Sequence, residues 1–448
     1  MCIYARVCAV CLCLLVLATP APALATGTGH LDPVHLFERA VDVGAAGDHS
    51  LARTYLEPVL LSPRVSRGAR ARAYYLRGLL FYRDGAYVSA AQDYRRALGF
   101  QPTLAQARNG LAWLHLKGLG VDRSVRRAET LYRLAARQGY VDAQYTLGLL
   151  LARGDELRRD PAEAIYWFET AAAGGHGEAA ALGGRLLVQA AEQTAATRAR
   201  LLLERAIALD HAGARLTLGK MLLATDPVGA RIRLEEAAST GSARAQAELG
   251  RLLLLGAKGI DAAPETGVQW LREAAKQGNA HAQTWLGWAF DTGLGTAIDP
   301  ARARRWYERA ARREDATAQF NLSLLYREGR GTPVRPDLAR QWLERAAALG
   351  QIDARTTLAW RLATAADDND RDARRALILA RAVVAEHETA QTLDVLAAAL
   401  AASGRYGEAR AEQQRALALA KAVEDAGVGR AALEARLAAY REERAWRE

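Results

Sequence analysis

Glycine pairs are the residues of this chain that most resemble chemical machinery. One pair lies in DTGLG, residues 291–295, and another in REGRG, residues 327–331. A glycine-rich loop between a strand and a helix can hold a phosphate on its backbone amides. The segment before the first pair, residues 285–290, instead has the apolar period of a helix. We therefore interpret the pairs as turns: the first glycine ends a helix with a positive φ, and the second turns the chain back.

Other patterns that could do chemistry are incomplete. None of the nine serines lies in G-x-S-x-G or precedes a lysine by three positions. His387-Glu388 lacks the second histidine of a zinc helix. The acidic run at residues 367–372 lacks the glycine and the glutamate of a calcium loop and is interpreted as a solvated loop. The sequence predicts no catalytic residues, no metal site and no cofactor, so we expect no enzyme.

The first residues predict a targeting segment. Arg6 precedes an apolar run over residues 7–18, and small residues lead to Ala25. We expect a signal peptide over residues 1–25, cleaved before Thr26. An uncleaved anchor is the alternative, but the run is shorter than the about 20 residues that span a bilayer. All four cysteines lie in this segment, so the expected mature chain is periplasmic or secreted, has no thiol and has no transmembrane segment.

The chain repeats itself with a period of 36 residues, which places the elements around the glycine pairs. A bulky dipeptide and an Ala-Ala pair recur at this spacing. The dipeptides are Trp270-Leu271, Trp306-Tyr307 and Trp342-Leu343, and the alanine pairs are Ala274-Ala275, Ala310-Ala311 and Ala346-Ala347. Because one ligand site would not require copies, the repetition favours a structural role for the glycines.

Each unit has the pattern of two helices. The first half places Ala, Leu, Gly and an apolar residue at i, i+4, i+5 and i+8, which lie on one helix face. The second half places an aromatic residue four positions before the alanine pair. A single hairpin cannot bury such faces, so the units must stack. We predict an all-α fold, an α-solenoid of stacked helix-turn-helix hairpins, with Trp167, Trp270, Trp306 and Trp342 in the core.

The pattern A-x-x-x-L-G-x-x-Y-x-x-G-x-G followed by A-x-x-W-Y-x-x-A-A resembles the Sel1-like repeat, a relative of the tetratricopeptide repeat. The resemblance spans residues 105–350, with about seven copies, of which those in 176–241 are degenerate. Residues 33–104 and 351–423 resemble tetratricopeptide repeats. A charged helix is expected over 428–448.

The resemblance implies a scaffold that binds protein partners along a concave groove lined by the first helix of each hairpin. Positions 5, 9 and 12 of the clear units would point into this groove. The groove candidates are Asn109, Trp113, Tyr145, Arg251, Trp288, Asp291, Phe320 and Arg327. Exposed aromatic residues often carry binding energy. The alternative is that Trp113, Trp288 and Phe320 only pack against the adjacent hairpin.

The charge balance adds a second class of partner. The formal net charge is +10, with 55 arginines and 5 lysines, which suits an anionic polysaccharide or another acidic surface. Arginine and glutamate alternate along many helices, as on a solvated face. Expected export argues against nucleic acid.

We expect an exported, non-catalytic scaffold for protein–protein interactions in assembly of a cell-envelope complex, as in polysaccharide secretion or envelope remodelling. The alternatives are an accessory protein that binds an anionic envelope polymer directly, and a cell-wall hydrolase or β-lactamase-like enzyme. The sequence carries no nucleophile or metal signature for such an enzyme.

Overall fold

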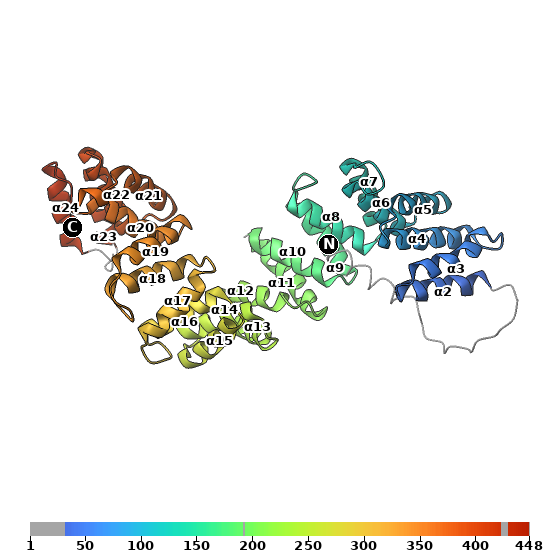
Figure 1. The fold of residues 1–448 in the computed structure, drawn as a ribbon, viewed down its shortest axis with the longest axis horizontal. Helices are drawn as coiled ribbons and strands as arrows, with labels where there is room; N and C mark the ends of the chain where they lie inside the picture. Colours follow the sequence, from blue (N-terminus) through green and yellow to red (C-terminus); the bar gives the residue numbers. More distant parts are fainter. Residues whose placement is uncertain (1–31, 191–192, 423–428, 448) are drawn as a thin grey trace. The chain divides into compact units, whose positions relative to one another are not determined.

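A computed structural model describes residues 32–190, 193–422 and 429–447. The chain forms two compact units, with the boundary between Met221 and Leu222 in one helix. Within each unit, antiparallel helices follow one another as stacked hairpins (Figure 1). The described residues contain no strand, only an isolated bridge between Ala257 and Ile260. The predicted all-α solenoid of helix hairpins is confirmed. The predicted signal peptide lies outside the described residues.

The helices up to the boundary are α2 (Pro33–Ala45), α3 (His49–Leu61), α4 (Arg67–Arg83), α5 (Tyr87–Phe100), α6 (Ala105–Lys117), α7 (Val125–Arg137), α8 (Val141–Arg153), α9 (Pro161–Ala173), α10 (Gly177–Ala190), α11 (Gln193–Ala208) and α12 (Ala214–Leu222).

The helices of the second unit are α13 (Pro227–Ser239), α14 (Ala243–Leu255), α15 (Pro264–Lys276), α16 (Ala280–Thr292), α17 (Pro300–Ala311), α18 (Ala316–Glu328), α19 (Pro336–Ala348), α20 (Ile352–Thr364), α21 (Ala373–Glu386), α22 (Ala390–Ala402), α23 (Tyr406–Ala422) and α24 (Arg430–Arg441), with a short 3-10 turn η1 (Asp368–Asp370).

The turn between α16 and α17 shows how local sequence closes a hairpin. Gly293 ends α16 in the left-handed conformation, with φ 80°. Asp299 caps α17 by accepting a hydrogen bond from the Arg302 amide at 2.9 Å, and Pro300 takes the first helical position. The Asp299 amide donates back to the Phe290 carbonyl at 2.8 Å. The glycine is therefore a helix terminator, as the sequence predicted.

The second glycine of the pair joins neighbouring hairpins. Gly295 also has a positive φ, 69°, and a Cβ there would lie 2.3 Å from the carbonyl oxygen of Pro264 at the start of α15. Gly331 and Gly120 make the same approach. A Cβ at either position would lie 2.4 Å from a backbone atom of the preceding hairpin, in Pro300 and Tyr87 respectively. The second glycine thus turns the chain and also lets the loop touch the preceding hairpin.

Inside each hairpin, a glycine of the first helix lies against a bulky side chain of the second. A Cβ at Gly287 in α16 would lie 2.8 Å from ring carbons of Tyr307 in α17. Gly148 and Phe168 repeat this approach at 2.8 Å. Because glycine has no Cβ, the backbone of the first helix lies directly on the ring.

This packing corrects the predicted core. Trp167 is buried, but Trp270, Trp306 and Trp342 are only partly buried, and the next residue in each case fills the core: Leu271, Tyr307 and Leu343. Helix geometry gives the reason. Tyr307 lies in the middle of the face formed by Ala303, Ala310 and Ala311, whereas Trp306 is rotated about 100° from Tyr307 and lies at the edge of that face. The prediction that Trp306 is a core plug is therefore wrong.

Glutamine side chains tie each hairpin to the one before it. The Gln283 amide donates to the carbonyl of Ala275, eight residues earlier, at 3.2 Å, and Gln283 is buried. Gln144, Gln246 and Gln319 make the same bond to Ala136, Ala238 and Ala311. A buried carbonyl at the end of each second helix is thereby satisfied.

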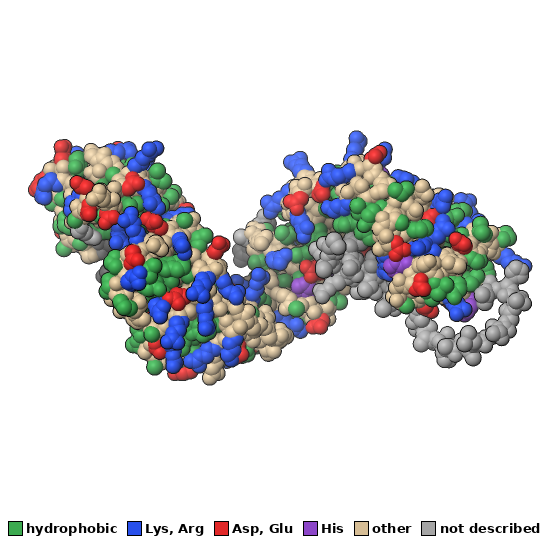
Figure 2. Space-filling model, in the orientation of Figure 1, with side chains coloured by type: hydrophobic (Ala, Val, Ile, Leu, Met, Phe, Trp, Pro, Cys, Tyr) green, Lys and Arg blue, Asp and Glu red, His purple; other side chains and the backbone are tan. Residues whose placement is uncertain are grey.

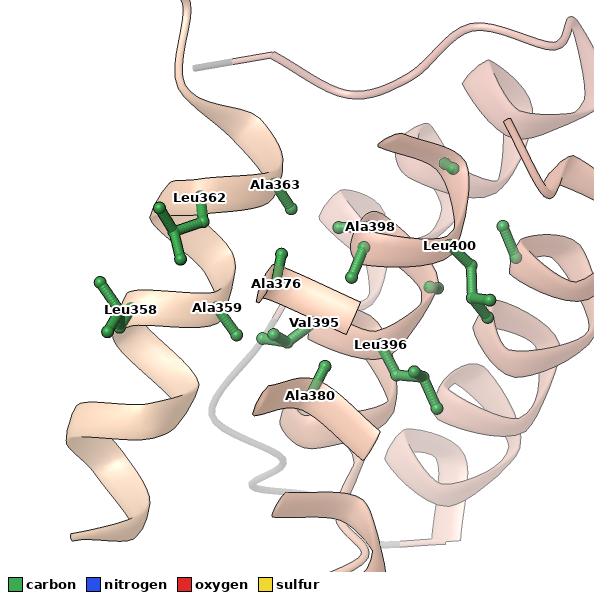
Figure 3. Close-up of a cluster of buried hydrophobic side chains, with 14 of the residues drawn as sticks. Leu358, Ala359, Leu362, Ala363, Ala376, Ala380, Val395, Leu396, Ala398 and Leu400 are labelled. Carbon is green, nitrogen blue, oxygen red and sulfur yellow. The ribbon is translucent and has the colours of Figure 1, made fainter. Parts of the chain in front are cut away.

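The last hairpins share one apolar cluster, shown in Figure 3. Ala359 and Ala363 on α20 point toward Ala376 of α21 and Val395 of α22, whereas Leu358 and Leu362 lie on the other side of α20. The C-terminal helix α24 packs on α23 and buries Leu433 and Tyr440. It lies where the first helix of another hairpin would begin and so covers the end of the stack.

The stack of the second unit is curved, and the first helix of each hairpin lies on its concave side. Neighbouring first helices contact one another, namely α14 with α16, α16 with α18, and α20 with α22. Among the described residues of this unit, neighbouring second helices form no comparable packing. The exposed side of the first helices is therefore the inner face of the second unit, and we use that name below.

Tyr307→Ala tests the corrected core. The ring is fully buried, so its removal is expected to lower the free energy of unfolding by about 3–5 kcal/mol. Trp306→Ala is the matched control and should cost much less, because that ring is partly exposed. Urea denaturation followed by circular dichroism measures both. Equal losses would contradict the assigned faces.

Gly295→Ala tests the contact between hairpins. Gly241→Ala is the control, since Gly241 has φ 85° but an added Cβ would meet nothing within 4 Å. The control should cost about 1–2 kcal/mol for the left-handed backbone alone. Gly295→Ala should cost more, because its Cβ would overlap the Pro264 carbonyl. Melting temperatures of both variants decide, and an equal shift would rule out the close approach as a constraint.

Candidate protein-binding face

One side chain from each first helix recurs along the inner face of the second unit. These residues follow one another at the repeat spacing, on α14, α16, α18 and α20. We call them the inner row: Arg251, Trp288, Leu324 and Trp360. All four are partly buried. Part of each side chain packs against neighbouring helices, and the rest is accessible to solvent.

The largest aromatic cluster of the inner face lies on α16. Trp288 meets Trp285 edge to face, with ring centroids 5.6 Å apart. The Trp285 indole donates a hydrogen bond to His281 at 3.0 Å. Both indoles are partly buried and pack against the core formed by α14 to α19. This edge-to-face geometry holds the two rings in fixed orientations.

A charged network adjoins the tryptophans. Asp291, one turn beyond Trp288, forms an ion pair with Arg330 from the next hairpin. Arg330 also donates to Glu328 at 2.8 Å, and Glu328 accepts from Arg327 at 2.7 Å. Burial raises the pKa of Asp291 although Arg330 favours its charged form. The predicted candidates Asp291 and Arg327 are therefore linked through Arg330 and Glu328.

The other two candidates of this unit are separated from that network. Arg251 lies on α14, where its guanidinium is 3.6 Å from Glu248. Phe320 is partly buried against the apolar cluster of the last hairpins. Phe320 therefore does pack against a neighbouring hairpin, as the alternative interpretation proposed, while part of its surface stays accessible.

The three candidates of the first unit are less open. Asn109 and Tyr145 are only 8% and 7% exposed. The Tyr145 ring stacks on His176 with centroids 4.2 Å apart, and burial raises its pKa to about 12. Trp113 is partly buried and donates to the Tyr82 hydroxyl at 2.9 Å. Position 5 packs on neighbouring helices, so the expectation of an open groove position is wrong for Asn109 and Tyr145.

Sequence reasoning missed several side chains of the inner face. Trp285 and His281 are one turn apart on the helix that carries Trp288, so the helical period could have grouped them. Trp360 lies 36 residues after Leu324, so the repeat period could also have identified this position on α20. Arg330 had no such signal, because its contact with Asp291 depends on how two hairpins stack.

Arginines gather on the exposed side of the second helices of the second unit, which we call the outer face. Figure 2 shows Lys and Arg side chains over the part of the unit that contains α15 to α17. Arg302, Arg305, Trp306 and Arg309 of α17 line a shallow pocket. The Arg309 guanidinium lies 4.5 Å from the Trp306 ring centroid, and Arg345 repeats this contact with Trp342 at 4.8 Å. Arg305 and Arg309 form no ion pair with a described carboxylate.

A second shallow pocket lies in the first unit, and part of its wall is a cluster of ion-paired side chains. Its wall includes Arg133, which pairs with both Glu129 and Glu163. The hydrogen bond from Arg133 holds the pKa of Glu163 below its ordinary value. These ion pairs therefore stabilise the contact between α7 and α9.

The acidic run at residues 367–372 is held by arginines. Asp370 accepts a hydrogen bond from Arg340 at 2.7 Å, and Asp367 caps the short turn that follows it. No group of three or more histidine, cysteine, aspartate or glutamate side chains is placed to hold a metal within residues 32–190, 193–422 and 429–447. Within the same ranges, no helix has the length and apolarity to cross a membrane.

Comparison with known proteins identifies the repeat. The family model described as Sel1 repeat matches residues 71–100, 105–140, 141–176, 243–279, 280–315 and 316–351. The first match falls in the segment that we assigned to the tetratricopeptide-like flank. The inner row from Arg251 to Leu324 lies on three consecutive matched copies.

Comparison with solved structures gives similar helical-repeat proteins, and the first of those named here has a TM-score above 0.5 and agrees with this match at the level of the fold. A Sel1 repeat protein from Oxalobacter formigenes has 24% identity and a TM-score of 0.54, covering 75% of this chain and 96% of its own. The protective antigen c5321 of uropathogenic Escherichia coli, which displays an SLR fold, has 21% identity, coverages of 87% and 92%, and a TM-score of 0.42. Yeast Tom70 has 11% identity, coverages of 92% and 96%, and a TM-score of 0.38. No curated protein matches the chain.

Arg330→Met tests the charged network. It leaves the Asp291 carboxylate, whose side chain is 12% exposed, without this partner and should lower the free energy of unfolding at pH 7 by about 1–3 kcal/mol. Because the pKa of Asp291 is raised in the folded chain, the protonated carboxyl favours the folded state at low pH. This contribution is lost as the pH rises through the folded-state pKa of Asp291. The loss should therefore shrink as pH falls toward about 4. Urea unfolding at several pH values checks this, and a loss independent of pH would contradict it.

Proposed function

This chain is a Sel1-repeat protein, and from that premise we propose that it is an exported, non-catalytic scaffold that binds protein partners in assembly of a cell-envelope complex. A stacked-hairpin scaffold suits protein–protein interaction because each repeat adds contact surface in a fixed frame. The proposal of export, and of a periplasmic or secreted location, rests on the pattern of residues 1–25.

The observation that carries the proposal is the tryptophan pair on α16. Trp285 and Trp288 are partly exposed on the inner face, although the repeat requires only small and apolar residues beneath them. Tryptophan and arginine are enriched among the residues that dominate binding energy at protein interfaces. Beside these tryptophans lie Asp291, paired with Arg330, and Arg327, paired with Glu328, so the inner face offers apolar anchors and a polar rim.

Trp288→Ala tests this function in the full chain. We expect it to remove most of the protein partners captured from an envelope extract, with little change in melting temperature, because the ring is only partly buried. Trp306→Ala is the matched control, since it removes an indole from the outer face. Quantitative mass spectrometry of captured proteins gives the readout.

Two outcomes would contradict the proposal. Loss of the same partners from both variants would mean that the inner face is not specific. Capture that survives Trp288→Ala but is lost with Arg305→Ala and Arg309→Ala together would favour the second candidate, an accessory protein that binds an anionic envelope polymer. The outer arginines beside Trp306 are the observation that favours this candidate, and its binding should weaken as salt rises.

A further inference from the structure

A buried ion pair fixes the C-terminal helix to the end of the second unit. Arg436 of α24 is 7% exposed, and its Nε donates to Asp394 of α22 at 2.8 Å. Asp394, 3% exposed, also accepts from Gln413 at 2.8 Å, and Gln413 donates to the Leu433 carbonyl at 3.1 Å. A buried carboxylate with two donors is well compensated, so α24 is held in one position.

The same arginine reaches the inner row. The Arg436 guanidinium lies 5.1 Å from the ring centroid of Trp360 and 5.7 Å from that of Trp446. Both distances fall within the range of cation–π attraction. Trp360 is the inner-row residue of α20, so the chain itself covers this position of the face, whereas Trp288 is uncovered by any comparable segment among the described residues.

The segment beyond α24 extends this cover across α20. Ala445 and Trp446 pack against the apolar cluster of the last hairpins, the cluster that Phe320 and Trp360 also contact. Arg447 donates to the Ala363 carbonyl at 3.2 Å, a contact between residues 84 positions apart. Residues 445–447 thus present an apolar anchor and a cation to the inner face, as a short peptide ligand would.

This fit is incomplete, which distinguishes the segment from a core element. The Trp446 indole nitrogen is buried and has no hydrogen-bond partner among the described residues. No backbone–backbone hydrogen bond within the described ranges joins residues 445–447 to α20 or α22. Burial and the nearby Arg371 lower the pKa of Arg447. A segment held by side chains alone, with one buried donor unsatisfied, costs little to displace.

We propose that the inner face at Trp360 is a peptide-binding site whose resident ligand is the chain's own residues 445–447, and that its partner is a protein segment presenting tryptophan beside arginine. The segment in place is the template for this chemistry: the indole packs on the apolar cluster and the guanidinium reaches a carbonyl at the end of α20. The inference deepens the proposed function, because it names the class of ligand for the inner face.

Competition with the tethered segment follows from this arrangement. A segment attached to its own site acts at an effective concentration in the mM range. A free peptide at micromolar concentration would therefore be excluded from the unmodified chain. A partner must bind more tightly than the segment, or bind along the uncovered inner row as well and so gain from two linked contacts.

The test uses the full chain and a labelled peptide of residues 442–448, Glu-Glu-Arg-Ala-Trp-Arg-Glu. In the Trp446→Ala chain the site is open, so fluorescence anisotropy should show peptide binding at least about tenfold tighter than to the unmodified chain. A peptide with alanine in place of tryptophan should not bind. Combining Trp360→Ala with Trp446→Ala should abolish binding of the labelled peptide, whereas combining Trp306→Ala with Trp446→Ala should not.

A second variant protects the test against a folding defect. Arg447→Ala alters an exposed residue and removes the bond to Ala363, so it should admit the peptide while α24 keeps its Arg436 anchor. Equal binding to the unmodified and both opened chains, or no binding to either opened chain with an unchanged melting curve, overturns the proposal. Exchange of the segment between two copies, seen as a dimer that disappears with Trp446→Ala, also overturns it in favour of self-association.

These outcomes are separable from the proposed function. Failure of peptide binding with intact capture through Trp288 rejects only the Trp360 site. Capture that does not depend on Trp288, together with intact peptide binding, rejects only the envelope scaffold.

Discussion

The contact of a glycine backbone with a ring in the facing helix is the constraint on which the rest of this structure depends. In α16 and α17 a Cβ on Gly287 would meet the Tyr307 ring at 2.8 Å, and Gly148 and Phe168 repeat the geometry. This separation lets the alanines of both helices interlock beneath the ring. In α18, where Ser323 takes the glycine's place, the corresponding position of α19 holds the smaller Leu343.

Two further contacts convert hairpins into a stack. The second loop glycine lies on the backbone of the preceding hairpin, and the buried glutamine amide binds a carbonyl at that hairpin's end. Each contact joins nearest neighbours only, so stability is the sum of units and their interfaces. An end of the stack lacks such a neighbour. At the C-terminal end α24 supplies one, secured by Arg436 and Asp394.

Because small and apolar residues satisfy the interior, side chains outside it are free to differ between repeats. On the inner face of the second unit these are Trp288, Leu324 and Trp360 at one repeat position. On the outer face they are the arginines and tryptophans of α17 and α19. The two faces have different chemistry: the inner one offers aromatic anchors with paired charges, and the outer one offers arginines. Proteins would use the first, and anionic polymers the second.

The sequence by itself determined the 36-residue period, the helix hairpins, the terminating glycines and the family, because each of these depends on residues within one unit or on its exact recurrence. It also placed Trp288 and Asp291 on one helix face. Only the tertiary structure decided that Tyr307 rather than Trp306 enters the core, because a rotation of one residue depends on the facing helix. It alone buried Tyr145 against His176, paired Asp291 with Arg330, and brought Arg436 within cation–π distance of both Trp360 and Trp446. Those contacts join residues from different hairpins, and no local pattern encodes how separate hairpins meet.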